Sequence, residues 1–159
     1  MAEGSINLSA RLIVGGISRD VRGEVRHVNG FGFEQVDRGY IVRPSRTGEV
    51  RGWVGHRRDW KWYFAIEGAF DVGVVSPSSW ERPSRNQIPD MYSLAAETPV
   101  ILEIPPGLYA ASVAIRPNSA LMVFSSGLIS EARTDDFRLP SDYWSLGMSA
   151  DKTTGSCVS

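Results

Sequence analysis

Cysteine, histidine and lysine are nearly absent from this chain. Its 159 residues include one Cys and two His, and only Lys61 and Lys152 among the 17 basic residues are Lys. The single Cys157 excludes a disulfide framework within the chain and fits a reducing cytoplasm. Two histidines, His27 and His56, are too few for a transition-metal site built on imidazole ligands. We therefore expect no bound metal.

Long apolar runs and a strong net charge are also missing. No segment approaches the roughly 18 apolar residues of a membrane-spanning helix. The N-terminus lacks the basic and apolar regions of a signal peptide. The net charge of −1 argues against a broad surface for nucleic acid or membrane. The sequence predicts a soluble cytoplasmic protein with neither kind of partner.

Glycine and proline are spread along the chain and separate short runs rich in β-branched and aromatic residues. Many short strands with frequent turns are typical of an antiparallel sandwich or barrel. The runs predicted as strands are 13–14, 39–43, 50–56, 61–66, 69–75, 100–104, 111–115 and 120–124. Segments 127–137 and 141–146 have the pattern of short helical turns, and 76–90 that of a surface loop. We predict one all-β domain over 1–146 and a flexible C-terminal tail over 147–159.

The segment 48–68 has the spacing of the first cupin motif, in which a Gly, a His-x-His pair, a Glu and a second Gly stand at fixed intervals. Here Gly48 and Gly68 keep the glycines, Val54 replaces the first His, His56 keeps the second, and Lys61 replaces the Glu. The second motif needs a His where Ala110 stands, in the stretch that follows 105–107. The spacing therefore resembles a cupin jelly roll without its metal ligands.

Strand alternation predicts which side chains face the inside of such a barrel. Val54 and His56 share one face of 50–56, and Lys61 and Tyr63 share one face of 61–67, whereas Arg51 falls on the opposite face of its strand. The cupin spacing turns the face with His56 and Lys61 inward.

Three large aromatic residues, Trp53, Trp62 and Phe64, then fall on outer faces of the barrel. Large aromatic side chains on an outer face need a cover, which a second sheet or a partner subunit would supply. We therefore expect a homodimer.

Two inward residues are candidates for catalysis, and each has a structural alternative. His56 is a candidate general base or acid near neutral pH, or else a hydrogen-bonded turn residue. Lys61 is suited to polarising a carbonyl or stabilising an enolate. It alternatively snorkels to the barrel mouth or pairs with Glu67 or Asp71, because a buried ammonium without a partner is costly.

Arginine and tyrosine supply the remaining candidates. Guanidinium groups bind phosphate in bidentate fashion, although most surface arginines do nothing of the kind. Tyr40 is a candidate proton donor or a half-buried sheet residue. The arginines considered are Arg22, Arg38, Arg43, Arg51, Arg57 and Arg58. Asp135 and Asp136 precede Phe137 and a proline-containing stretch, so we interpret them as a turn or helix cap rather than as paired catalytic carboxylates.

Several segments together resemble the metal-independent cupins that act on nucleotide-linked 4-keto-6-deoxyhexoses. That group includes the dTDP-4-dehydrorhamnose 3,5-epimerases, the dTDP-sugar 3,4-ketoisomerases and the WxcM-like sugar epimerases. The similar segments are 20–23 (DVRG), 33–40 (FEQVDRGY), 51–56 (RGWVGH), 61–64 with 67–70 (KWYF and EGAF), 104–109 (IPPGLY) and 135–140 (DDFRLP).

The resemblance implies an isomerase that works as a dimer without a cofactor. In that family a His removes the proton beside a ketone, a Lys or Arg stabilises the enolate, and a Tyr or water returns the proton. The roles then fall on His56 as base, Lys61 or Arg51 as enolate stabiliser and Tyr40 as acid. The residues expected to bind the nucleotide sugar are Arg51, Arg38, Arg22 and Tyr63.

The chain departs from the family pattern at two places. The epimerases' catalytic His corresponds to Val54, and the Tyr expected after the last long strand is missing from 124–128. The favoured hypothesis is a sugar-nucleotide epimerase or isomerase in polysaccharide or deoxysugar biosynthesis. The alternative is a non-catalytic cupin that binds a sugar nucleotide or glycan.

Overall fold

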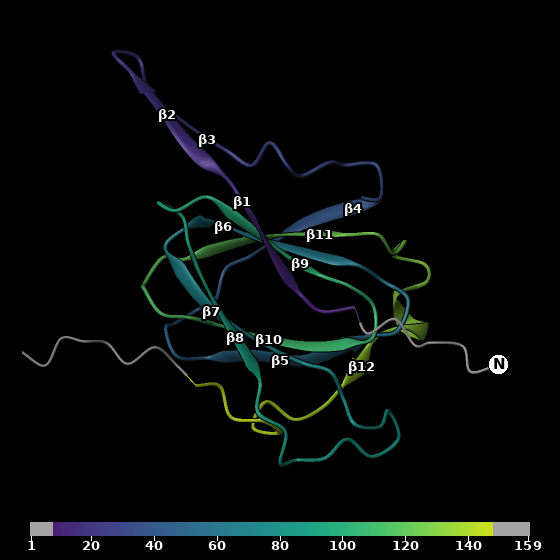
Figure 1. Ribbon diagram of the computed structural model, residues 1–159. Helices are drawn as coiled ribbons and strands as arrows, with labels where there is room; N and C mark the ends of the chain where they lie inside the picture. Colours follow the sequence, from purple (N-terminus) through teal and green to yellow (C-terminus); the bar gives the residue numbers. More distant parts are fainter. Residues whose placement is uncertain (1–7, 148–159) are drawn as a thin grey trace, which may run out of the picture.

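The computed structural model describes residues 8–147, and two five-stranded sheets packed face to face form its body (Figure 1). The first sheet has the strand order β1 (Arg11–Val14), β9 (Val100–Ile104), β6 (Lys61–Glu67), β11 (Ala120–Ser125) and β4 (Arg38–Val42). The second has the order β12 (Phe137–Arg138), β5 (Val50–His56), β10 (Leu108–Ala114), β7 (Ala69–Val75) and β8 (Asp90–Ala95). All pairings are antiparallel, which confirms the predicted all-β, cupin-like sandwich.

The strand prediction succeeds where apolar residues dominate. Strands β5, β7 and β9 have the predicted bounds, and every residue of β7 and β10 is buried. The pattern predicts neither β8 nor β12, nor the hairpin of β2 (Gly16–Asp20) and β3 (Gly23–His27), whose residues are largely exposed. The segment 127–137 contains one three-residue 3-10 helix, η1 (Ala132–Thr134).

The core between the sheets is aliphatic and holds the two layers together. Each fully buried Leu or Val contributes about 1.5–3 kcal/mol relative to an exposed one. Its most buried members are Phe70, Val72, Leu94, Leu102 and Leu121.

The chain itself covers the outer aromatic residues, which corrects the expectation that a second sheet or a partner subunit is needed there. Trp53 is fully buried against Trp144, and its Nε1 donates to the Trp144 carbonyl over 3.1 Å. Trp62 is buried beneath Phe31, and Phe64 packs into the same cluster. Figure 1 shows the two covering segments, the loop between β3 and β4 and the C-terminal stretch, on opposite outer faces of the sandwich. The homodimer therefore needs support from other features.

The β2–β3 hairpin projects away from both sheets (Figure 1). Val21 and Val25 are exposed on it, and Arg22 lies in its turn, where its guanidinium is ion-paired with Asp20 over 2.5 Å. The predicted tail after Gly147 lies outside the described residues. Within residues 8–147, no helix is long and apolar enough to cross a membrane.

Candidate active site

A cavity of about 680 Å³ lies between the sheets, and strands β4, β5, β6, β10 and β11 line it together with residues of the 126–138 segment. This volume is in the ~300–1,000 Å³ range of small-molecule sites. Part of its wall is apolar and includes Val42, Val54, Ala110, Leu121 and Val123. The rest is polar and charged, so the cavity suits a ligand with one apolar edge and several oxygen atoms.

His56 ends β5 at the cavity wall, and only 18% of its side chain is exposed. Its Nε2 lies 4.0 Å from Oδ1 of Asp136. The other oxygen of this carboxylate, Oδ2, accepts two hydrogen bonds from Arg138, which hold Asp136 in place. Burial, and secondly the positive charge of Lys61, lower the pKa of His56 below its ordinary value. The imidazole is therefore neutral at physiological pH and able to accept a proton.

Lys61 begins β6 and is only 5% exposed, but its charge is compensated. Its Nζ lies 2.7 Å from Oδ2 of Asp59 and donates to Oγ of Ser125 over 2.9 Å. Burial alone would raise the pKa of Asp59, but hydrogen bonds from Lys61 and Ser125 outweigh it and lower the pKa. The predicted alternative partners are wrong for Lys61: its partner is Asp59, and Glu67 pairs with Arg43.

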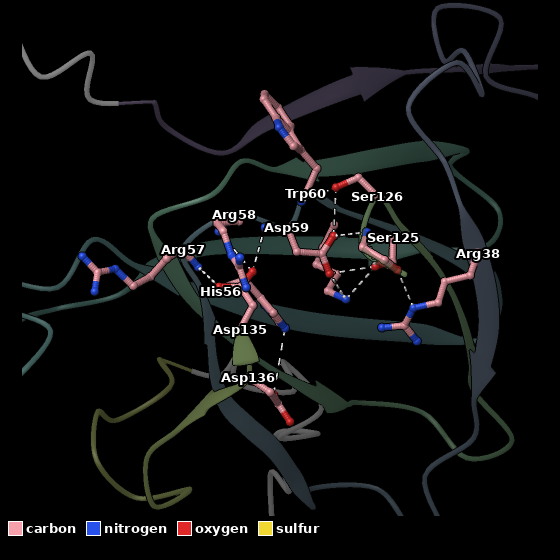
Figure 2. A network of polar contacts seen from close by, with 12 residues as sticks. Arg38, His56, Arg57, Arg58, Asp59, Trp60, Ser125, Ser126, Asp135 and Asp136 are labelled. Atoms are coloured by element: carbon pink, nitrogen blue, oxygen red, sulfur yellow. Dashed lines mark hydrogen bonds and ion pairs between the residues drawn. The ribbon is translucent and has the colours of Figure 1, made fainter. Parts of the chain in front are cut away.

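Asp135 organises the turn that joins His56 to Lys61. Its carboxylate accepts three consecutive backbone N–H groups, from Arg57 at 2.8 Å, Arg58 at 3.1 Å and Asp59 at 2.9 Å. Figure 2 shows Asp135 and Asp136 entering the polar network from the segment before β12. The interpretation of these two aspartates as a turn or helix cap is incomplete, because Asp135 fixes the distant 57–59 turn and Asp136 faces His56.

The remaining polar groups on the wall have donors to spare. The Arg51 guanidinium and the Tyr63 hydroxyl line the cavity and make no hydrogen bond or ion pair with another described residue. Arg38 donates its Nε to the Gly127 carbonyl over 2.8 Å and lies 5.4 Å from the ring centre of Tyr40. Burial raises the pKa of both phenols, so Tyr40 and Tyr63 stay protonated at neutral pH.

Arg51 reaches the cavity although simple alternation places it on the opposite face. The pairing of β5 with β10 shifts register between Ala110 and Ser112, so that Gly52 and Trp53 stand opposite Ala111 alone. Such a bulge reverses the alternation on one side of the irregularity. The sequence carries one signal of it, because a glycine inside a strand often marks a bulge, and Gly52 stands at this irregularity with a φ of 138°.

Six of the seven predicted site residues meet at this one cavity, and the seventh does not. His56, Lys61, Tyr40, Arg51, Arg38 and Tyr63 line it. Arg22 lies in the turn of the β2–β3 hairpin and is not among the lining residues. Sequence reasoning missed Asp59 and Ser125, although an acidic residue two positions before a strand Lys was an available signal.

No group of three or more His, Cys, Asp or Glu side chains in the described part of the chain is arranged to hold a metal ion. The first cupin His is replaced by Val54, and Ala110 stands where the second motif requires a His. Elemental analysis of purified protein remains the test of the predicted metal-free state.

No protein-family model and no curated protein matches this chain. Solved structures do. A variant of a 3,4-ketoisomerase from Thermoanaerobacterium thermosaccharolyticum, in complex with TDP-4-keto-6-deoxyglucose, has a TM-score of 0.64 at 18% identity, over 84% of this chain and 90% of its own. The fold is that of the cupin ketoisomerases and epimerases.

Two epimerases extend the structural likeness. The rmlC epimerase from Mycobacterium tuberculosis has a TM-score of 0.66 at 18% identity, over 82% of this chain and 68% of its own. ChmJ, a 3'-monoepimerase from Streptomyces bikiniensis in complex with dTDP-quinovose, has a TM-score of 0.69 at 17% identity, over 94% of this chain and 79% of its own. At these identities the comparison establishes a shared fold, as the cupin spacing predicted.

Proposed function

We propose that this chain is a sugar-nucleotide epimerase or isomerase that moves a proton beside the ketone of a dTDP-linked 4-keto-6-deoxyhexose. The observation that carries the proposal is the convergence of a neutral, partly buried His56, a charge-compensated Lys61 and two incompletely bonded arginines on one cavity. The fold is shared with a ketoisomerase and a monoepimerase whose structures hold TDP-linked sugars, which supports the substrate class.

Proton abstraction falls to His56. Its lowered pKa leaves a ring nitrogen free to take the acidic proton from the carbon next to the ketone, and Asp136 stabilises the imidazolium that forms. The electron pair of the broken C–H bond moves onto the carbonyl oxygen as an enolate. Lys61 has a third N–H beyond its bonds to Asp59 and Ser125, and this donor stabilises the oxyanion. Because the Lys61 ammonium is ion-paired with Asp59, the lysine acts as an electrophile rather than as an imine-forming nucleophile.

The second half of the reaction and the binding of the nucleotide fall to the groups with free donors. Tyr40 and Tyr63 are neutral phenols and return a proton to the enolate, directly or through water. Arg51 and Arg38 face the cavity with unused N–H groups and bind the diphosphate. The product then serves polysaccharide or deoxysugar synthesis.

A homodimer is part of the proposal and is supported by the β2–β3 hairpin. A two-stranded hairpin with both faces in water is at best marginally stable on its own. Packing of the hairpin against a second copy of the chain would bury Val21 and Val25. It would also bring Arg22 of one subunit into contact with the surface of the other. Sedimentation of the full chain tests this: a monomer at about 100 μM, well above ordinary dimer dissociation constants, contradicts it.

Proton exchange in D2O is the direct test of the activity. The protein is incubated with dTDP-4-keto-6-deoxyglucose, and the ring protons are followed by NMR. We expect deuterium beside the ketone, and its position separates 3,5-epimerase from 3,4-ketoisomerase chemistry. His56→Asn should reduce exchange by at least about a thousandfold while leaving the unfolding transition in place. Retained exchange in this variant rejects His56 as the base.

A second candidate function is the binding of a sugar nucleotide without turnover. The observation in its favour is that Ser125 occupies the region where the related enzymes carry a Tyr, and its hydroxyl is committed to Lys61 and Asp59. Saturable broadening of the nucleotide signals without any deuterium incorporation would decide for this candidate.

A further inference from the structure

We propose that Asp59 is a positioning residue that holds both cationic groups of the reaction site, Lys61 and Arg38, in place. Sequence reasoning assigns it no role, and it lies between Arg58 and Trp60 in the turn before β6. The inference rests on the proposed function, because that function gives Lys61 the oxyanion and Arg38 the diphosphate.

The hydrogen-bonding capacity of Asp59 is fully used within the chain. An ionised carboxylate offers about four lone-pair sites. Oδ2 takes Lys61 Nζ at 2.7 Å and Ser125 Oγ at 2.8 Å, and Oδ1 takes Ser126 Oγ at 2.9 Å and the Gly127 N–H at 2.7 Å. Asp59 is also only 8% exposed. It therefore has no lone pair left for a substrate proton and acts through the groups it holds.

One arm of this arrangement fixes the ammonium of Lys61. An ammonium has three donors, and Asp59 and Ser125 take two of them. These two bonds fix the direction of the third N–H. Because Lys61 lines the cavity, this third donor is available to a ligand there. A lysine on a flexible four-carbon chain needs such restraint to meet a developing oxyanion at a fixed point.

The other arm reaches Arg38 through Gly127. The Gly127 N–H binds Asp59, and the Gly127 carbonyl accepts Arg38 Nε over 2.8 Å, so one residue links the carboxylate to the guanidinium. Figure 2 shows the two ends of this path, Asp59 beside Ser125 and Arg38 on β4. The Nε bond leaves the terminal nitrogens of Arg38 available for an anion.

Residue 127 must be glycine for the arrangement to close. A Cβ there would lie 2.9 Å from both Cγ and Oδ2 of Asp59, closer than real Cβ atoms come to other heavy atoms. The substitution Gly127→Ala therefore displaces the carboxylate without changing any charge. Gly147→Ala is the matched control, because its Cβ meets nothing nearer than Met91 at 3.9 Å.

Side-chain NMR tests the positioning without reference to activity. The chain has only two lysines, so 15N-lysine labelling gives a simple Nζ spectrum, which Lys61→Met assigns. A second sample labelled with 15N-arginine gives the Nε signals, and Arg38→Lys assigns that of Arg38. In the unchanged protein we expect slowly exchanging signals from Lys61 Nζ and Arg38 Nε. Asp59→Asn should abolish both, because an amide keeps only one acceptor oxygen and turns an NH2 group toward existing donors. Gly127→Ala should shift both signals, and Lys61→Met should leave the Arg38 signal unchanged.

Kinetics and ligand binding separate a positioning role from a merely structural one. Asp59→Asn should reduce turnover by about 100-fold or more, as for loss of an oxyanion donor. It should also weaken dTDP binding about tenfold, as Arg38 loses its support. Lys61→Met should reduce turnover to a similar extent but leave dTDP binding near that of the unchanged protein. Asp142→Asn, which removes the same charge at an exposed site, should change neither.

Two results would overturn the proposal. In Asp59→Asn, persistence of both protected signals shows that neither cation depends on Asp59. An unchanged Arg38 signal in both Asp59→Asn and Gly127→Ala shows that the path through Gly127 is wrong. If Asp59→Asn does not fold, Gly127→Ala alone decides between these results. Absence of dTDP binding and of proton exchange in the unchanged protein refutes the proposed function, whereas the NMR signals still decide the role of Asp59.

Discussion

The two halves of the polar cavity wall differ in how much of their hydrogen-bonding capacity the chain itself uses. On the saturated side, Asp59 and Asp135 accept four and three bonds respectively, counting the Lys61 contact, from side chains and backbone. On the open side, the side chains of Arg51, Tyr40 and Tyr63 line the cavity without a hydrogen bond to any described residue. Saturated groups hold the site together, and open groups are left for a ligand. Substitutions on the first side should therefore cost stability, and those on the second should cost binding.

The largest effect is expected from Asp135→Ala on the saturated side. It leaves three consecutive N–H groups of the 57–59 turn without their acceptor, one of them on the buried Asp59. An unsatisfied buried donor costs about 1–3 kcal/mol, so the free energy of unfolding should fall by about 3 kcal/mol. Urea unfolding followed by tryptophan fluorescence measures it.

Asp142→Ala is the control for that loss, because Asp142 is exposed and close in sequence. Its free energy of unfolding should stay within about 0.5 kcal/mol of the unchanged protein. An equally small change for Asp135→Ala would mean that water replaces the carboxylate at no cost, and the contrast between the two sides would fail.

A smaller effect, of a different kind, is expected from Arg51→Gln on the open side. No bond within the described chain is lost, so the unfolding free energy should stay within about 0.5 kcal/mol. The dissociation constant for dTDP should rise about tenfold, the effect of one charge-assisted hydrogen bond. Isothermal titration calorimetry measures it, with the exposed Arg82→Gln as control. A stability loss without a binding loss would show that Arg51 belongs to the saturated side.

The open side is also the part of the site that sequence reasoning predicts best. Position along a strand is visible in the sequence, so the inward direction of Tyr63 follows from strand alternation and cupin spacing. Tyr40 is predicted from its residue type and from the family resemblance. The chemistry of Arg51 predicts correctly that it is a candidate for binding a ligand, but strand alternation places it on the wrong face of β5. The reason is that a bulge in the β5–β10 pairing changes the direction of its side chain.

The saturated side depends on contacts between distant segments, which a single sequence does not record. Asp59 meets Ser125 and Gly127 across more than 60 positions, and Asp135 meets the 57–59 turn across more than 70. The same reason explains the wrong expectation about the outer aromatics. No pattern in the sequence predicts that Trp144 packs against Trp53 and covers it.

The smallest effect concerns His56, which stands where the two sides meet. Burial first, and then Lys61, lower its pKa, while the carboxylates of Asp59, Asp135 and Asp136 act in the opposite direction. Its NMR titration midpoint should lie below the ordinary value of about 6.5. Only two histidines are present, and His56→Asn assigns the signals. Asp136→Asn should lower the midpoint further, because it removes a charge that favours the imidazolium.

The sign of the linked stability change follows from where the proton binds. Between the lowered midpoint and about pH 6.5, the unfolded chain binds more protons at residue 56 than the folded chain does. The free energy of unfolding should therefore rise with pH through that interval and be level above it. The pKa of Asp59 is also lowered. The stability that Asp59 contributes is lost only at more acidic pH, because the ordinary pKa of an aspartate in the unfolded chain is about 3.9. Urea unfolding at about pH 5 and about pH 7.5 should show a smaller difference in His56→Asn than in the unchanged protein. Equal differences would mean that His56 titrates as in water and that the cavity does not keep it as a neutral base.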